Sequence, residues 1–318
     1  MKFIPALKRK SSLILFLAIF AASGCTSTSQ AAISQSTAET KPSLAAASTA
    51  TLDPSPSPLP SQTPTSNPTA TSAPTSTPTL GPTATWTNHP PEKVVAPILL
   101  YHHVSDEDTD NRYVISTTVF TAQLLELRDW GYTVIPISIL VDVLIHGGLL
   151  PQRPVVISFD DGNEDIYQNA FPIMKSFGDP GTFFMVANRL GSPGFVTADE
   201  LKEMAAAGWE IGSHSWSHID ITKDHDAIWH EVANSRIVLQ KEIGVPIDVF
   251  AYPFGTTDPT ISQKVQDYGY KAAVGLGTLN THTWGTLFYL SRQEVRRDYS
   301  MEAFSKLLPW TDAQNPVN

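Results

Sequence analysis

One stretch of this 318-residue sequence, residues 155–162, restricts what the chain can fold into more than any other. Its first five residues are mostly apolar strand formers, and Asp160, Asp161 and Gly162 follow them directly. The apolar run predicts a buried strand of a parallel sheet. Two neighbouring carboxyl groups repel each other and resist desolvation, so after a buried strand they indicate a nearby cation or a chemical role. A solvated turn is the alternative, because Asp-Gly is a common turn dipeptide.

Strand-like and helix-like segments alternate along the sequence from about residue 91 onward. The predicted strands are residues 94–104, 132–137, 155–159, 181–186, 209–212, 249–252 and 271–274. The predicted helices are residues 117–130, 138–146, 164–177, 197–207, 223–243, 259–268 and 300–308. This alternation is typical of an α/β fold in which helices cover a parallel sheet.

Several of the predicted strands end in polar or reactive residues. These ends are Tyr101-His102, Asp160-Asp161, His214 and Tyr252-Pro253-Phe254-Gly255. Chemistry at the carboxyl ends of parallel strands favours a barrel, in which the strand-to-helix loops share one face. An open doubly wound sheet is the competing architecture. The sequence contains no glycine-rich dinucleotide loop and no Walker lysine, which argues against a nucleotide site.

The first 25 residues have the pattern of a bacterial export signal. A basic start is followed by an apolar stretch, residues 11–22, that is too short for an ordinary membrane span. The next residues, Ala22-Ser23-Gly24-Cys25, resemble a lipobox, whose cysteine is lipidated and becomes the mature N-terminus. We therefore expect a lipid-anchored protein at the cell surface. An ordinary signal peptide with a chance cysteine is the alternative.

Residues 26–90 are rich in Ser, Thr, Pro and Ala and carry almost no charge, so they cannot bury a core. We predict a disordered tether that holds a folded domain, residues 91–318, away from the membrane. From residue 91 onward the sequence has 16 Lys and Arg against 29 Asp and Glu, which argues against a nucleic-acid partner. Cys25 is the only cysteine, so no disulfide framework is expected. We expect a monomer.

His214 and His218 are the first candidate metal ligands. If this segment begins a helical turn, two imidazoles four residues apart fall on one side of it. Such a pair is often structural when it stands alone. One carboxylate would complete a set that binds divalent metals and leaves positions open for water and substrate. The Asp160-Asp161 step after an apolar strand offers that carboxylate.

Three motifs together resemble the polysaccharide deacetylases, the NodB-homology or carbohydrate esterase family 4 enzymes. The motifs are Ser158-Phe159-Asp160-Asp161-Gly162, His214-Ser215-Trp216-Ser217-His218 and Phe250-Ala251-Tyr252-Pro253-Phe254-Gly255. The resemblance covers about residues 97–308 and implies a distorted (β/α) barrel with fewer than eight strands. It implies that Asp161, His214 and His218 hold a divalent metal, usually zinc. It also implies that Asp160 is the general base and that the backbone N–H of Phe254 stabilises the oxyanion.

The sequence departs from the family pattern in the third motif. Many members have an arginine at the position of Ala251, where it orients the base. Arg292, from a later loop, is the candidate to replace that arginine. A surface or structural role for Arg292 is the alternative.

The second departure concerns the general acid, because the late Leu-x-His motif that usually carries it is not evident. Residues 97–103 resemble the branch of the family that acts on extracellular poly-N-acetylglucosamine, where a histidine after the first strand enters the active site. By position His102 is the candidate acid, with His103 as a structural neighbour. His282 is the second candidate, but its Thr/Asn/Gly surroundings predict a solvated role. In a third reading, His102 and His103 are capping or surface residues.

Tyr252, Pro253, Trp216 and Arg292 are the candidate substrate-binding residues. The rings of Tyr252, Trp216 and Trp284 could stack on sugar rings, with core packing as the alternative.

Together these features predict a metal-dependent hydrolase that removes acetyl groups from a polysaccharide containing N-acetylglucosamine. An O-acetyl polysaccharide esterase would use the same site. A cell-wall binding module that has lost catalysis is a third possibility, disfavoured because Asp160 and both histidines are present. Peptidoglycan, poly-N-acetylglucosamine and chitin-like chains all fit as substrates.

Overall fold

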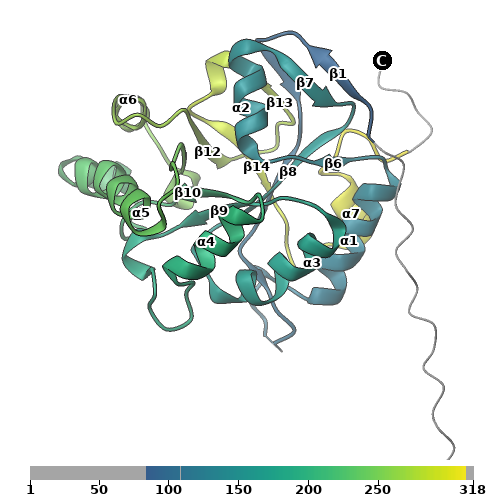
Figure 1. The fold of residues 1–318 in the computed structure, drawn as a ribbon, viewed down its shortest axis with the longest axis horizontal. Coiled ribbons are helices and arrows are strands. Elements are labelled where there is room, and N and C mark those ends of the chain that lie inside the picture. Colours follow the sequence, from purple (N-terminus) through teal and green to yellow (C-terminus); the bar gives the residue numbers. More distant parts are fainter. Residues whose placement is uncertain (1–83, 108, 313–318) are drawn as a thin grey trace, which may run out of the picture. The chain divides into compact units, whose positions relative to one another are not determined.

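Seven parallel strands close into a barrel at the centre of the protein (Figure 1). The computed structural model describes residues 84–107 and 109–312. Around the barrel the strands run in the order β3 (Ile98–Tyr101), β14 (Leu290–Glu294), β12 (Ala272–Leu276), β11 (Val249–Ala251), β10 (Glu210–Ser213), β9 (Thr182–Met185) and β8 (Pro154–Phe159). Pairing of β8 with β3 closes the ring, and the short strand β6 (Thr133–Val134) adds to the start of β8. The predicted barrel of fewer than eight strands is therefore confirmed, and the open sheet is excluded.

Strand β8 explains why the two aspartates stand where they do. All six of its residues are buried, as the apolar run predicts. Ile157 and Phe159 pack in the hydrophobic cluster beneath the surrounding helices, whereas Val156 belongs to the cluster inside the barrel. Because side chains alternate along a strand, Ser158 and Asp160 follow Val156 on the inner side. Asp160 thus begins the inner lining at the carboxyl end of the barrel.

Helices surround the barrel and one helix closes an end of it. They are α1 (Thr117–Asp129), α2 (Ile137–His146), α3 (Phe171–Phe177), α4 (Ala198–Ala206), α5 (Ser235–Ile243), α6 (Pro259–Asp267) and α7 (Met301–Ser305). Leu140 and Leu144 of α2 join the inner cluster with residues from the starts of several strands, so α2 covers the amino-terminal end of the barrel. Helix α4 begins with a capping box formed by Thr197 and Glu200. The other end of the barrel is left to the strand-to-helix loops.

Short strand pairs extend the fold outside the barrel. Antiparallel pairs join β1 (Trp86–His89) to β7 (Gly148–Pro151) and β2 (Lys93–Val95) to β13 (Thr281–Thr283), and a parallel pair joins β4 (His103–Val104) to β5 (Val114–Ile115). Strand β1 lies before residue 91, so the last residues of the predicted tether include a strand. The predicted signal peptide, Cys25 and the tether up to residue 83 lie outside the described residues. No helix among the described residues is long and apolar enough to span a membrane.

The observed segments differ from the predicted ones in several places. The predicted strand 94–104 is divided into β2, β3 and β4, with Pro97, which has no backbone N–H to donate, between β2 and β3. The predicted helix 223–243 is regular only in α5; before it lie two 3-10 turns and a π-helical turn, η5 (Trp229–Asn234). Strand β14 was not predicted, because Leu290 is its only apolar residue.

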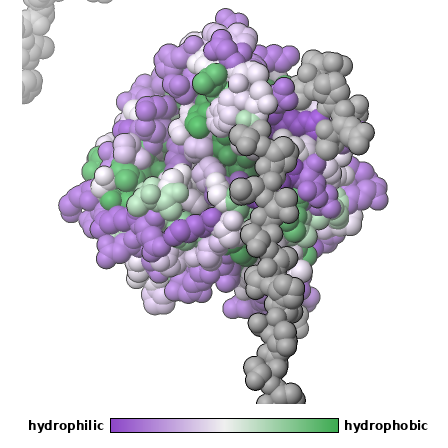
Figure 2. Space-filling view, turned by 45° about the vertical axis from the view of Figure 1, so that its right-hand side comes forward, coloured by the Kyte–Doolittle hydropathy of each residue, from purple (hydrophilic) through white to green (hydrophobic). Residues whose placement is uncertain are grey.

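The face drawn in Figure 2 is largely hydrophilic, with hydrophobic residues in separate patches.

Candidate active site

A cleft opens at the carboxyl ends of the barrel strands. The side chains that line it come from six separate strands or from the loops that follow them, as expected for a barrel. The lining includes Leu100, His102, His103, Tyr113, Asp160, Asp161, His214, His218, Tyr252, Phe254, Leu276, Arg292 and Glu294. The predicted catalytic and metal-binding residues are thus brought together in one place.

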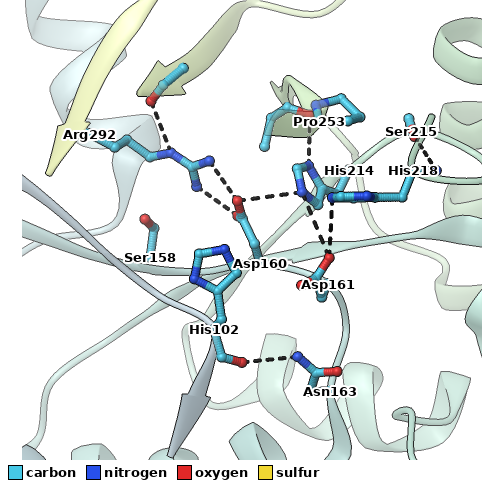
Figure 3. Close-up of polar contacts among 12 residues, drawn as sticks. His102, Ser158, Asp160, Asp161, Asn163, His214, Ser215, His218, Pro253 and Arg292 are labelled. Carbon is cyan, nitrogen blue, oxygen red and sulfur yellow. Dashed lines mark hydrogen bonds and ion pairs between the residues drawn. The ribbon is translucent and has the colours of Figure 1, made fainter. Parts of the chain in front are cut away.

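Asp161, His214 and His218 form a compact group of potential metal ligands (Figure 3). One nitrogen or oxygen atom from each lies within 4.8 Å of those of the other two. Oδ1 of Asp161 is 3.4 Å from Nε2 of His218 and 4.0 Å from Nε2 of His214. Two ligands about 2.1 Å from one tetrahedral ion lie about 3.4 Å apart, so small side-chain adjustments would let all three atoms bind one ion.

His214 is oriented by its other ring nitrogen. Its backbone N–H donates to the Met185 carbonyl at 2.8 Å, and its Nδ1 lies 2.9 Å from the Ala251 carbonyl oxygen. Because a carbonyl can only accept, Nδ1 carries the proton and Nε2 presents a lone pair to the cleft. Burial lowers the pKa of His218 to about 4, and His214 adds to the effect. The imidazole of His218 is therefore suited to the neutral form that metal binding requires.

Asp160 is held by Arg292. The two Nη atoms of Arg292 donate to the two oxygens of Asp160, each at 2.6 Å, and both side chains are almost completely buried. Burial alone would raise the pKa of Asp160, but the charge of Arg292, assisted by His214 and hydrogen bonding, holds that pKa well below its usual range. Arg292 is on strand β14, not in a later loop, and its side chain points inward because Leu290, two positions earlier, does so. The geometry matches the predicted orienting role, whereas the expected substrate contact of Arg292 is not supported, since its Nη atoms are engaged with Asp160.

His102 lies beside Asp160 in the cleft (Figure 3). Its carbonyl accepts a hydrogen bond from Nδ2 of Asn163 at 3.0 Å, and its ring centroid is 4.7 Å from that of Tyr113. Within the described part of the chain, the buried Nδ1 of His102 has no hydrogen-bond partner. Burial lowers the pKa of His102, while the charges of Asp160 and Asp161 oppose this effect.

His282 does not reach the cleft. It lies on β13, is 1% exposed, and its Nε2 is 3.0 Å from the Ala96 carbonyl oxygen. Burial lowers its pKa to about 4. The prediction of a solvated histidine in a loop is therefore wrong, because pairing of β13 with β2 covers the ring.

Phe254 lies in a strained turn, η6 (Pro253–Gly255). The N–H groups of Gly255 and Thr256 donate to carbonyls within this turn, and neither bond uses the N–H of Phe254. The φ angle of Phe254 is 58°, and its ring centroid is 4.7 Å from that of His218. Phe254, whose N–H is the predicted oxyanion donor, is therefore in ring contact with one residue of the metal-ligand group.

Left-handed backbone conformations are concentrated in this cleft. Asp161, Ser215, His218 and Phe254 have φ between 58° and 75°, and Glu92 is the only other non-glycine residue with positive φ among those described. Each such residue costs about 1 kcal/mol or more and persists only where its surroundings enforce it. The concentration of strain indicates that the loops are shaped for a function.

Comparison with known proteins agrees with this geometry. Residues 148–273 match the family model of the polysaccharide deacetylases. The chain contains a polysaccharide deacetylase domain. The Bacillus subtilis protein YxkH is 28% identical to it over 179 residues, which are 56% of this chain and 63% of YxkH, so less than two thirds of that relative is covered. The poly-β-1,6-N-acetyl-D-glucosamine N-deacetylase of Staphylococcus aureus is 26% identical over 206 residues, 58% of this chain and 70% of that enzyme.

Two solved structures resemble the deacetylase domain. IcaB from Ammonifex degensii superimposes with a TM-score of 0.58 at 25% identity, covering 71% of this chain and all of that one. The Streptococcus pyogenes deacetylase PplD, solved in complex with acetate, superimposes with a TM-score of 0.62 at 24% identity. The superposition covers 69% of this chain and 99% of the PplD chain. The similarity to PplD shows a shared fold only.

The predicted sugar-stacking surface does not form in the deacetylase domain. Tyr252 and Pro253 are buried, and the Tyr252 hydroxyl donates to the Phe288 carbonyl at 2.9 Å. Trp216 is half-buried against His230, and Trp284 is exposed but outside the cleft lining. The apolar surface of the cleft is instead supplied by the exposed side chains of Phe254 and Leu276.

Sequence reasoning missed several residues that support the site. Glu231 accepts hydrogen bonds from the loop between the two metal-site histidines. Asn163 holds the backbone of His102. Asp165 accepts from the backbone N–H of Val104 and lies 3.2 Å from Nδ1 of His103. A motif gives no signal for such contacts, because they depend on which elements are neighbours in space.

Proposed function

We propose that this protein hydrolyses the N-acetyl groups of an extracellular polysaccharide that contains N-acetylglucosamine. The observation that carries the proposal is the convergence of three functions in one cleft. A two-histidine, one-carboxylate group lies beside a buried carboxylate with its own arginine, and a third histidine faces them. The Staphylococcus aureus relative named for de-N-acetylation of poly-β-1,6-N-acetyl-D-glucosamine supports the substrate class.

Asp161, His214 and His218 would hold one divalent metal, which we propose is zinc. Two imidazoles and one carboxylate with open positions suit this ion. When bound, such a metal lowers the pKa of water and polarises a carbonyl oxygen. The orientation of His214 by Ala251 supports the assignment, because a carbonyl partner on the second ring nitrogen is usual for a ligating histidine.

Asp160 is the proposed general base. Arg292 keeps it ionised and fixes the plane of its carboxylate. Each Asp160 oxygen uses one lone pair for Arg292 and retains another for a proton. Oδ2 of Asp160 lies 3.5 Å from Nε2 of His214, so a water molecule at the metal-ligand group would be within its reach. Asp161 is unsuited to the same role, since metal ligation would occupy its lone pairs.

The remaining proton transfer and charge stabilisation are assigned to His102 and Phe254. Attack of water on the acetyl carbonyl forms a tetrahedral oxyanion, to which the Phe254 N–H would donate. The C–N bond then breaks, and the leaving nitrogen needs a proton. His102 lies beside Asp160 in the cleft; burial lowers the pKa of His102, and the charges of Asp160 and Asp161 oppose this effect. The products are a free amine on the sugar and acetate.

We also propose that the domain acts at the cell surface, anchored through lipidated Cys25 and held on the predicted tether. This part of the proposal is supported by the sequence pattern of residues 1–25.

Mass spectrometry of products tests the reaction. Zinc-loaded protein is incubated separately with oligomers of β-1,6-linked N-acetylglucosamine, chitin oligomers, peptidoglycan fragments and O-acetylated xylan. We expect loss of acetyl groups with new free amines, abolished by Asp160→Asn and unchanged by Asp142→Asn, which alters an exposed aspartate on α2. Release of acetate from xylan alone would replace this proposal with O-acetyl esterase activity. No release from any polymer would contradict both.

A further inference from the structure

The loop that carries both metal-site histidines has little regular structure of its own. Residues 214–218 leave strand β10, and the N–H of His214 still donates to β9 at Met185. On one side of the loop, the carbonyls of Ser215 and Trp216 accept from the backbone of Ala187 and Asn188, each at 3.0 Å. These contacts fix the carbonyl side of the loop only.

The N–H side of the same loop is held by one side chain, that of Glu231. Its Oε2 accepts from the backbone N–H of Trp216 at 3.1 Å and of Ser217 at 2.9 Å. Its Oε1 accepts from the hydroxyl of Ser217 at 2.7 Å. Both carboxyl oxygens of Glu231 are therefore directed at the two residues midway between His214 and His218.

Glu231 is in an unusual position for a carboxyl group. It is 2% exposed, and among the described residues no basic side chain forms an ion pair with it. Burying a carboxyl group without a cationic partner costs several kcal/mol unless hydrogen bonds replace its water. All three hydrogen bonds that the structure gives the carboxyl group of Glu231 go to the histidine loop, so no other observed hydrogen bond accounts for the burial of this carboxyl group.

The backbone of the loop requires such a restraint. Ser215 and His218 both have left-handed φ angles, 67° and 62°. The N–H of His218 donates to Oγ of Ser215 at 2.9 Å, which tightens the turn but does not tie it to the rest of the domain. Without a partner for the N–H groups of Trp216 and Ser217, this strained turn would compete with more relaxed conformations in which the two rings separate.

We infer that Glu231 is a positioning residue that fixes the distance between His214 and His218 and thereby sets the metal affinity of the site. The inference rests on the proposed metal site. It assigns to Glu231 no contact with substrate or metal, because its oxygens are occupied by the loop. Residues that orient metal ligands typically change metal affinity by about 10- to 100-fold when they are removed.

The local structure around Glu231 agrees with this role. It lies in the π-helical turn η5, where a regular α-helix was expected. A π turn contains an additional residue, which rotates the side chains that follow relative to an α-helix. Val232 and Ala233 remain buried in the same turn, and Ser235 after it is buried as well. The π turn thus lets a carboxyl group enter the interior while its neighbours stay packed.

Zinc affinity measured by chelator competition tests the inference on the full chain, starting from metal-free protein. Glu231→Ala should weaken zinc binding by about 10- to 100-fold. Glu231→Gln should restore most of the affinity, because an amide oxygen can accept from both backbone N–H groups and the amide nitrogen can donate to Ser217. Ser217→Ala removes one of the three bonds and should weaken binding by only a few-fold. The visible spectrum of the Co²⁺-loaded variants should shift in the same order.

Glu210→Ala is the matched control. Glu210 is a half-buried glutamate, and its carboxyl accepts from the backbone N–H of Ser138 at the opposite end of the barrel. Its replacement should lower the melting temperature and leave zinc affinity unchanged. Wild-type zinc affinity in Glu231→Ala, or an equal loss in Glu210→Ala, would overturn the inference. If Glu231→Ala does not fold, unaltered affinity and spectrum in Ser217→Ala overturn it. Failure of the wild-type protein to bind zinc would instead reject the metal site itself.

Discussion

Arg292 donates a hydrogen bond of 2.6 Å to each oxygen of Asp160, although the two residues lie 132 positions apart in the sequence. In the family that the sequence motifs resemble, the arginine that orients the base is expected at the position of Ala251, on β11. Here it comes from β14, which lies two places from β11 around the barrel. The same two-pronged contact is thus reached from another strand, because side chains from all the barrel strands converge on the cleft.

Arg292→Lys should reduce turnover by about 10²-fold while zinc remains bound. A lysine ammonium cannot donate to both carboxylate oxygens in one plane, so Asp160 loses its fixed orientation. The pKa of Asp160 should also rise, since its main cationic partner is less well placed. The acidic limb of kcat/KM should therefore move to higher pH, as measured in a series of buffers. Arg128→Lys, far from the cleft, is the control; an unmoved limb in Arg292→Lys would contradict the role of Arg292.

Substitutions of the two adjacent aspartates should have different effects on turnover and on zinc content. Asp160→Asn preserves shape but cannot accept a proton, so turnover should fall by about 10²-fold or more with zinc retained. Asp161→Asn should instead lower zinc content, because a neutral amide is a poorer ligand for the cation. Elemental analysis beside initial rates measures both. Full zinc content in Asp161→Asn and also in His214→Ala would contradict the assignment of these residues as metal ligands.

His102→Ala should slow turnover with zinc retained and flatten the alkaline limb of the pH–rate profile. As pH rises through the pKa of His102, its protonated form disappears and the leaving amine lacks a donor. Without the imidazole this dependence should vanish. His282 is buried on β13 outside the cleft, so His282→Gln should leave the profile unchanged. A normal profile in His102→Ala would exclude it as the acid.

The residues that could be predicted from the sequence are those that end apolar strands. Asp160 follows an apolar run, and His214 follows a short strand, so periodicity and motif spacing place both at the carboxyl end of the barrel. Arg292 lies on a strand whose only apolar residue is Leu290, because Arg292 and Glu294, which follow Leu290 at alternate positions, line the cleft. A pattern based on hydrophobicity cannot identify such a strand.

Contacts between distant elements account for the other errors. His282 was expected in solvent because its neighbours are turn formers, yet pairing with β2 buries it. Tyr252 was a candidate substrate-binding residue, yet its side chain is buried and its hydroxyl donates a hydrogen bond to the Phe288 carbonyl. Glu231 lies in a predicted helix, but only the π turn and the neighbouring loop explain its burial. Each depends on a partner that local sequence does not specify.

Cys25→Ser should release the protein from membranes. A single lipidated cysteine at the mature N-terminus would be the anchor, and serine cannot be lipidated in its place. Fractionation of cells that express each form, followed by immunoblotting, measures the change. A Ser23→Ala variant, altered beside the cysteine, should remain with the membranes. Membrane association of Cys25→Ser equal to that of the wild type would mean that another element anchors the chain.

The buried imidazole of His282 should make stability depend on pH. Its pKa is about 4 in the folded protein, against about 6.5 when exposed in the unfolded chain. Between these values the unfolded state binds a proton that the folded state does not, so the free energy of unfolding falls as pH decreases from about 6.5 toward 4. The loss should approach about 3 kcal/mol and is complete near the lower value.

Comparison with a variant isolates the contribution of His282 from that of other histidines. Gln can still donate to the Ala96 carbonyl and does not titrate, so His282→Gln should lose less stability than the wild type when the pH is lowered from about 7 to 5. Thermal unfolding of both proteins at each pH gives the difference. His146→Gln, which alters an exposed histidine on α2, should follow the wild type closely. If His282→Gln and the wild type lose the same stability, protonation of His282 is not coupled to unfolding, and the His282 ring accepts a proton while β13 stays paired with β2.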